Sequence, residues 1–170
     1  MTTYQAAAAL RSQTLLREVL SRWASGVTVI TTVDLTGRPW GFTATSFAPV
    51  SLDPPLVAFC LSNSAQCRPV FGAAPGFAVH ILRLGQEEIA RTFATRGADK
   101  FAAVATAPGA YGVPVLGDSL ACLECRTTGI TDAGDHVVVF GEVHRAEAGD
   151  GEPLLYFRRG FGRLLPLAQR

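Results

Sequence analysis

Helical spacing of apolar residues occurs in only a few segments of this chain. The segment from Ser12 to Gly26 has the strongest pattern and predicts a helix that ends at Gly26. Its apolar residues fall on one face: Leu15, Leu16, Val19, Leu20 and Trp23. A short helix is expected from Cys67 to Ala73, and a further one from Gln86 to Ala94 with Glu87 and Arg91 paired at i,i+4.

Most of the other apolar residues stand in short runs rich in β-branched and aromatic types, which predict strands. The runs cover residues 27–34, 41–50, 56–61, 77–82, 120–130, 137–146, 153–159 and 161–165. Turn signals separate many of them, and Asp132–Asp135 predicts a hairpin between two long strands. Strands and helices do not alternate regularly, so the pattern favours a mainly β, antiparallel barrel with peripheral helices over a Rossmann sheet.

Length and charge narrow the class of protein. The 170 residues are enough for one domain, expected over residues 12–170, with residues 1–11 as a flexible extension. A net charge of +1 gives no electrostatic case for binding nucleic acid or an anionic membrane. No apolar run approaches the ~18 residues of a membrane helix, and the N-terminus lacks signal-peptide features. We therefore expect a cytoplasmic protein.

The cysteines and glycines exclude several kinds of site. Cys122 and Cys125 have the spacing of a metal-binding pair, but on a strand residues three apart face opposite sides, which predicts buried thiols and no metal. The one GxG motif, Gly160 to Gly162, lies too near the C-terminus for a Rossmann dinucleotide site. No nucleophile or zinc-hydrolase motif is present.

Hydroxyl side chains gather at two places. The segment from Gly41 to Val50 carries Thr43, Thr45 and Ser46, and residue type alone favours an ordinary edge strand over a polar rim that binds a heterocycle. Ser62–Ser64 follows the next strand, and its hydroxyls and amides suit a phosphate. His136 stands at the first residue of a buried strand after a Gly-Asp turn. It is either a solvated turn residue or a ligand contact.

The order of these segments resembles the short-chain flavin reductase family, the reductase components of two-component flavin-dependent monooxygenases. The resemblance covers about residues 16–164 and is carried by WASGVTVITT, GFTATSFAPVSLDPPLV, FAVHIL, DKF, LACLEC, GDHVVVFGEV and EPLLYFRRGFGRL. It implies a Greek-key, FMN-binding split barrel that forms a homodimer with flavin at the subunit interface. It further implies reduction of FMN or FAD by NADH or NADPH and delivery of reduced flavin to a separate monooxygenase.

The resemblance also implies roles for individual residues. His136 would hold the nicotinamide nucleotide beside the flavin as the residue nearest the reaction. The residues expected to bind the flavin ring are Thr43, Ala44, Thr45 and Ser46. Those expected at the ribityl chain and phosphate are Cys60, Leu61, Ser62, Asn63, Ser64, Arg96, Lys100 and Phe101. Tyr156 and Arg158 would approach the second ligand, whereas His80 and His144 match no family site and are expected to be structural.

Three residues depart from the family pattern. Thr45 stands where the family usually has Asn, Phe42 where Met is common, and Cys67 where Ser or Thr is common. The first change alters one side-chain hydrogen bond to the flavin and the third weakens a phosphate contact, while backbone N–H groups remain. Two other functions stay open from the residues alone: an oxidoreductase acting on another small molecule, and a non-catalytic flavin-binding subunit.

Overall fold

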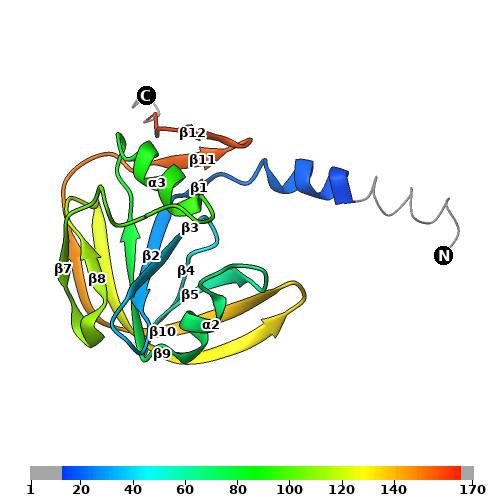
Figure 1. The fold of residues 1–170 in the computed structure, drawn as a ribbon. Coiled ribbons are helices and arrows are strands. Elements are labelled where there is room, and N and C mark those ends of the chain that lie inside the picture. Colours follow the sequence, from blue (N-terminus) through cyan, green and yellow to red (C-terminus); the bar gives the residue numbers. More distant parts are fainter. Residues whose placement is uncertain (1–12, 166–170) are drawn as a thin grey trace, which may run out of the picture.

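The computed structural model describes residues 13–165, so the expected extension over residues 1–11 lies outside the described part of the chain. A seven-stranded antiparallel sheet forms the body of the molecule (Figure 1). In sheet order its strands are β3 (Pro39–Ala44), β2 (Thr28–Val33), β6 (Gly76–Ile81), β9 (Ala121–Ala133), β10 (His136–Ala148), β5 (Pro55–Ser62) and β4 (Ala48–Leu52). The mainly β, antiparallel barrel class is therefore confirmed.

The two edges of this sheet are consecutive in the sequence. Strand β3 pairs with β2 at one edge, and β4 pairs with β5 at the other. Thr45–Phe47 connects them without belonging to either ladder, which brings the edges together and curls the sheet into a barrel. The expected single strand over residues 41–50 is wrong, because its two halves pair with different partners.

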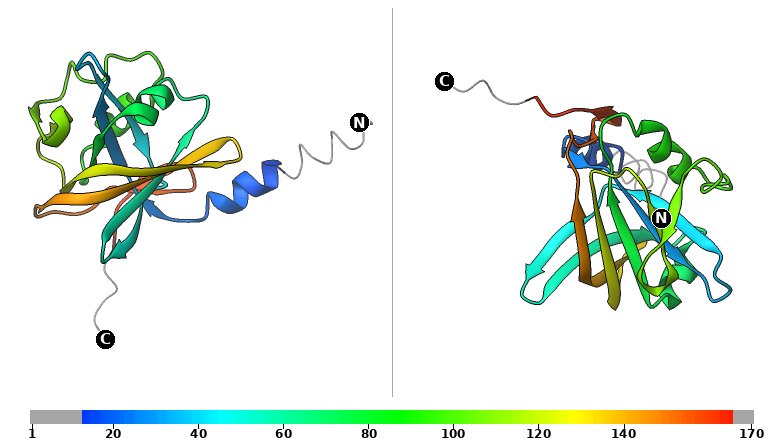
Figure 2. Two further views of the ribbon diagram at one scale, coloured as in Figure 1. Left: turned by 90° about the horizontal axis from the view of Figure 1, so that it is seen from below. Right: turned by 90° about the vertical axis from the view of Figure 1, so that its left-hand side faces the viewer.

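The barrel interior follows from alternation along the strands. In β10, Val137 and Val139 are buried and face the core, while the alternate residues Val138 and Phe140 are more exposed. Aromatic side chains fill the centre: the ring of Phe59 meets those of Phe71 and Phe77 edge-on, with centroids 5.7 and 5.0 Å apart. The hairpin of β9 and β10 is confirmed and supplies the longest strands of the sheet (Figure 2).

Smaller elements cover the barrel. Two short helices are α2 (Arg68–Ala73) and α3 (Glu87–Ala94). The remaining strands and the 3-10 helix are β1 (Ser25–Gly26), β11 (Leu155–Phe157), β12 (Gly160–Gly162), β7 (Thr106–Pro108), η1 (Ala110–Gly112) and β8 (Pro114–Leu116). In α3, Arg91 pairs with Glu88 at 3.7 Å, so the expected pair with Glu87 is wrong. No described helix is long and apolar enough to cross a bilayer.

The first helix differs from the expectation in its end. It is helical over residues 13–20 and does not continue to Gly26, because Ser25 and Gly26 pair with β11. Its apolar face is not packed on the barrel: Leu20 is 61% and Trp23 is 77% exposed. Figures 1 and 2 show this helix extending away from the body of the molecule.

His80 in β6 is fully buried and structural, as expected. Its Nδ1 donates to the carbonyl of Val29 at 3.0 Å, and its Nε2 accepts the backbone N–H of Leu116 at 3.0 Å. Burial lowers the pKa of His80 to about 4, because the protonated ring is poorly solvated there. His144 lies in β10 and is exposed. Burial also raises the pKa of Cys122 and Cys125 to about 12, so both are protonated thiols.

Candidate functional site

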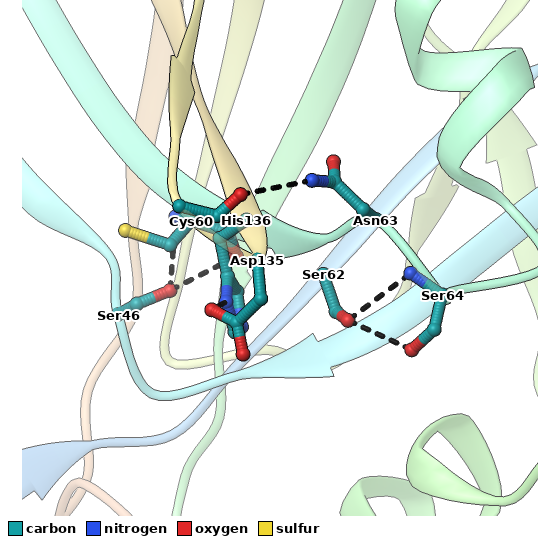
Figure 3. A network of polar contacts seen from close by, with 8 residues as sticks. Ser46, Cys60, Ser62, Asn63, Ser64, Asp135 and His136 are labelled. Atoms are coloured by element: carbon teal, nitrogen blue, oxygen red, sulfur yellow. Dashed lines mark hydrogen bonds and ion pairs between the residues drawn. The ribbon is translucent and has the colours of Figure 1, made fainter. Parts of the chain in front are cut away.

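A polar rim forms where β5 ends and β10 begins (Figure 3). The two strands pair with His136 directly opposite Ser62. Asn63, in the turn after β5, donates its backbone N–H to the Asp135 carbonyl at 2.9 Å and its side-chain amide to the Gly134 carbonyl at 3.3 Å. The Gly-Asp turn and the polar loop, which are far apart in the sequence, are therefore held together by one backbone and one side-chain hydrogen bond from Asn63.

The hydroxyls of Ser62 and Ser64 lie 2.9 Å apart, and the Ser64 backbone N–H donates to the Ser62 hydroxyl at 3.2 Å. Asn63 and Ser64 are exposed, so this turn presents small donors to the solvent. Hydroxyls and amide groups in a tight turn are a common cradle for an anion. The predicted phosphate segment and His136 are thus neighbours across one strand pair.

Ser46 ties the connection between the sheet edges to the same region. Its hydroxyl accepts the backbone N–H of Cys60 at 3.0 Å and donates to the Cys60 carbonyl at 3.2 Å. This double contact replaces the ladder that β4 makes further along β5, and it leaves Thr45 exposed at the opening. The polar rim is defined here as Thr45, Ser46, Cys60, Ser62–Ser64 and Gly134–His136.

His136 has one nitrogen engaged and one open. Its Nδ1 donates to the Asp135 carboxylate at 2.7 Å, and its side chain is 43% exposed. This hydrogen bond, with the attraction between the two groups, lowers the pKa of Asp135 below its usual value. An ionised Asp135 fixes the imidazole orientation and leaves Nε2 available to a ligand.

A cavity of about 710 Å³ adjoins the rim. It is lined by β3, by the turn before α2 and by the loop after α3. Among the residues expected to bind flavin, five line it: Thr43, Ser64, Arg96, Lys100 and Phe101. Because Ser64 also belongs to the polar rim, the rim and the cavity form one continuous site.

Lys100 has a structural contact that the sequence did not reveal. Its ammonium donates to the carbonyls of Gly41 and Phe93 at 2.9 and 2.8 Å, which fastens the loop after α3 to β3. Burial lowers the pKa of Lys100 from its usual value, and the nearby Cys67 opposes this shift. An ammonium has three donors, so one remains for a ligand in the cavity.

The remaining predicted residues lie elsewhere or contribute only backbone. Ala44 and Leu61 are buried in the core, so only their main-chain atoms can reach a ligand. Tyr156 packs on Phe161 with centroids 5.7 Å apart, and Arg158 donates its backbone N–H to Ser21 at 2.8 Å. These contacts place Tyr156 and Arg158 outside both the rim and the cavity of the described chain.

Several residues that line the cavity were missed by sequence reasoning, among them the stacked pair of Arg38 and Trp40. Both residues line the cavity, and the Arg38 guanidinium lies 5.0 Å from the centre of the Trp40 indole. Their alternation at the start of a strand was visible, since residues two apart share a face. That alternation gave no indication of a cavity, because other lining residues, 64–67 and 96–101, are distant in the sequence.

The donors in this site suit a phosphorylated heterocycle. Hydroxyls and amides line the rim, and three cationic side chains and one carboxylate line the cavity: Arg38, Arg96, Lys100 and Asp99. Among residues 13–165 no cluster of His, Cys, Asp or Glu has the geometry of a metal site. The residues therefore fit a flavin nucleotide, with neutral donors for its ring and sugar chain and positive charge for its phosphate.

Comparison with known proteins identifies close relatives. The model of the flavin reductase-like domain matches residues 20–165. The NADH:riboflavin 5'-phosphate oxidoreductase of Streptomyces pristinaespiralis is 43% identical, over 85% of this chain and 84% of that protein. The reductase subunit HsaB of a flavin-dependent monooxygenase from Mycobacterium tuberculosis is 37% identical, over 88% and 81%.

A longer relative and a solved structure are also similar to this chain. A probable flavin reductase of Rhizobium meliloti is 41% identical over 86% of this chain, and the chain spans only 47% of that protein's length. The NADH:FAD oxidoreductase SgcE6 of Streptomyces globisporus, solved with NAD and FAD fragments, superposes with a TM-score of 0.87. The two sequences are 37% identical, and the matched region covers 94% of this chain and 96% of the SgcE6 chain.

Proposed function

The chain belongs to the family of flavin reductase-like domains, and from this premise we propose that its polar rim and cavity hold a flavin nucleotide beside a reduced nicotinamide nucleotide. The enzyme is an NAD(P)H-dependent reductase of FMN or FAD. The observation that carries the residue assignment is the pairing of His136 with Ser62, which brings a phosphate-type turn and an open imidazole to one strand end.

The two ligands supply the chemistry, because a hydride passes directly from the nicotinamide to the flavin. The protein binds and orients them. Thr43–Ser46 lines the flavin ring, Cys60–Ser64 holds the sugar chain and phosphate, and His136 Nε2 contacts the nicotinamide nucleotide. Oriented backbone amides near Thr45 and Ser46 stabilise the negative charge that develops on the ring. Asp135 acts through His136 by fixing its ring.

Lys100, Arg96 and Phe101 form the wall of the cavity beyond the phosphate. Lys100 holds that wall in place through its two carbonyl contacts and offers its remaining proton to the phosphate. Tyr156 and Arg158 belong to the proposal only if a second subunit brings them to its neighbour's site. That condition links the site to the oligomeric state.

The proposed assembly is a homodimer. The helix of residues 13–20 and Trp23 expose five large apolar side chains to solvent: Leu15, Leu16, Val19, Leu20 and Trp23. An apolar face of this kind is typical of a surface that another protein covers. A second copy of this chain would cover it, and a stable interface of that type buries on the order of 2,000 Å².

Light scattering of the full chain and of Leu20→Glu tests the dimer. The wild type should have the mass of two chains, and the variant should dissociate. Leu35→Glu is the matched control, because Leu35 is 93% exposed in the β2–β3 turn and should leave the mass unchanged. A wild type that is monomeric and fully active would contradict the dimer.

The proposal also includes a partner enzyme and a cellular location. The reduced flavin passes to a separate flavin-dependent monooxygenase, a role supported by the name of the HsaB relative. The four cysteines are free thiols, which is in keeping with the cytoplasmic location expected from the sequence.

The direct test of the function is oxidation of NADH and NADPH with and without added FMN, FAD and riboflavin. The proposal expects oxidation that scales with added flavin. Tight flavin binding with no oxidation of either nucleotide would instead identify a non-catalytic flavin-binding subunit. Oxidation that requires a different acceptor would identify an oxidoreductase for another small molecule.

A further inference from the structure

The turn between β9 and β10 lies beyond the ladder that β5 forms with β10. Its two residues, Gly134 and Asp135, come directly before His136, which pairs with Ser62 at the end of β5. Because β5 ends there, its ladder does not extend to the turn. Across residues 13–165, the hydrogen bonds that tie Gly134 and Asp135 to a segment outside their own hairpin both come from Asn63.

Asn63 directs its donors at the turn rather than at the open side of the polar rim. Its backbone N–H donates to the Asp135 carbonyl at 2.9 Å, and its side-chain amide donates to the Gly134 carbonyl at 3.3 Å. Figure 3 shows the Asn63 side chain pointing toward the turn. The hydroxyls of Ser62 and Ser64 instead lie 2.9 Å from each other. The three polar residues after β5 therefore face two different neighbours.

The contacts of Asn63 reach His136 in two steps. They hold the backbone of Gly134 and Asp135, and the Asp135 carboxylate in turn accepts the His136 Nδ1–H at 2.7 Å. Gly134 has a φ of +65°, and a glycine is free to leave that conformation, so sterics alone do not fix this backbone. A carboxylate orients an imidazole only if its own backbone is held, so Asn63 determines where Nε2 points.

We propose that Asn63 is a positioning residue for the reaction: its side-chain amide holds the Gly134–Asp135 turn so that His136 meets the nicotinamide nucleotide. The inference rests on the proposed function and deepens it, because it assigns the Asn63 side chain to the nicotinamide side of the site. Contact with the flavin phosphate then falls to the hydroxyls of Ser62 and Ser64.

Hydrogen exchange of the ligand-free full chain tests the structural step. In Asn63→Ala the peptide of residues 131–137 should exchange roughly 3- to 10-fold faster than in the wild type, the size of one lost exposed hydrogen bond. Ser64→Ala is the matched control, because it removes a neighbouring side chain and leaves both Asn63 contacts in place. Its exchange at residues 131–137 should equal that of the wild type.

Steady-state kinetics with saturating FMN and a separate FMN titration test the functional step. Asn63→Ala should raise KM for NADH about 3- to 10-fold, with kcat and the FMN dissociation constant within about 2-fold of the wild type. Ser64→Ala should reverse this pattern, with weaker FMN binding and an unchanged KM for NADH. A loss confined to FMN binding in Asn63→Ala would overturn the inference by assigning its side chain to the flavin.

A double-mutant cycle with His136→Ala shows whether Asn63 acts through His136. Once the imidazole is absent, Asn63→Ala should change kcat/KM for NADH by less than about 2-fold. The same loss in both backgrounds would overturn the inference, as would unchanged exchange or unchanged NADH kinetics in Asn63→Ala. A wild type that oxidises neither nucleotide with any flavin would overturn the proposed function and with it the role of Asn63, whatever the exchange shows.

Discussion

His80 and His136 lie in the same sheet, but their surroundings differ. His80 is buried in β6, and backbone groups of Val29 and Leu116 use both of its ring nitrogens. His136 opens β10 at the barrel rim, and only its Nδ1 is engaged, by the adjacent Asp135. The difference teaches that burial with two backbone partners makes a histidine structural, whereas one fixed and one open nitrogen leaves a histidine able to contact a ligand, which is the role proposed for His136.

The largest effect should come from removing the buried ring. His80→Ala leaves the Val29 carbonyl and the Leu116 N–H without partners and creates a cavity, which should lower the free energy of unfolding by about 2–5 kcal/mol. Urea unfolding followed by circular dichroism measures this. His136→Ala, assayed beside it, should lose well under 1 kcal/mol. Equal losses for the two variants would remove the distinction between the regions.

The pH dependence of stability should also come from His80. In the unfolded chain its pKa is near 6.5, and in the fold it is about 4, so only the unfolded state takes up a proton between these values. The contribution is complete above pH 6.5 and is lost as the pH falls to 4, by about 3 kcal/mol. Urea unfolding at several pH values should show this slope in the wild type and in His136→Ala. A wild type with flat stability across that range would contradict the buried neutral ring.

Much of the barrel could be predicted because local sequence patterns determine many of its strands and turns. Alternation along Val137–Phe140 and the turn at Gly134 are enough to predict β10 and its hairpin. The break at Thr45–Phe47 could not be predicted, because it arises from β3 and β4 pairing with different strands. The exposure of the first helix could not be predicted from its amphipathic pattern, and in one chain the large apolar side chains of its face are 54–61% exposed.

The candidate site was predictable in part. The residue types and the family resemblance located His136 and Ser62–Ser64, and the structure brings them together. The cavity was not predictable, since its walls come from segments distant in sequence. The carbonyl contacts of Lys100 were hidden for the same reason, and they give this residue a structural part as well as a place in the site.

Lys100 combines features of both histidines. It is half-buried and donates to two backbone carbonyls, as a structural residue does, and it keeps one donor for a ligand. Lys100→Ala should weaken FMN and FAD more than riboflavin, by roughly 1.5–3 kcal/mol for a lost charge-assisted bond to phosphate. Fluorescence titration with the three flavins measures this, with riboflavin as the internal control. A similar loss for all three would show that Lys100 only holds the loop.

The central claim is that His136 is a ligand contact whose removal leaves the fold and the flavin site intact. The most direct measurement is a flavin titration together with NADH kinetics on His136→Ala. The account predicts unchanged flavin binding and a loss of about 1–3 kcal/mol in kcat/KM for NADH, the cost of one truncated polar contact. Unchanged NADH kinetics would contradict it and leave His136 as a solvated turn residue.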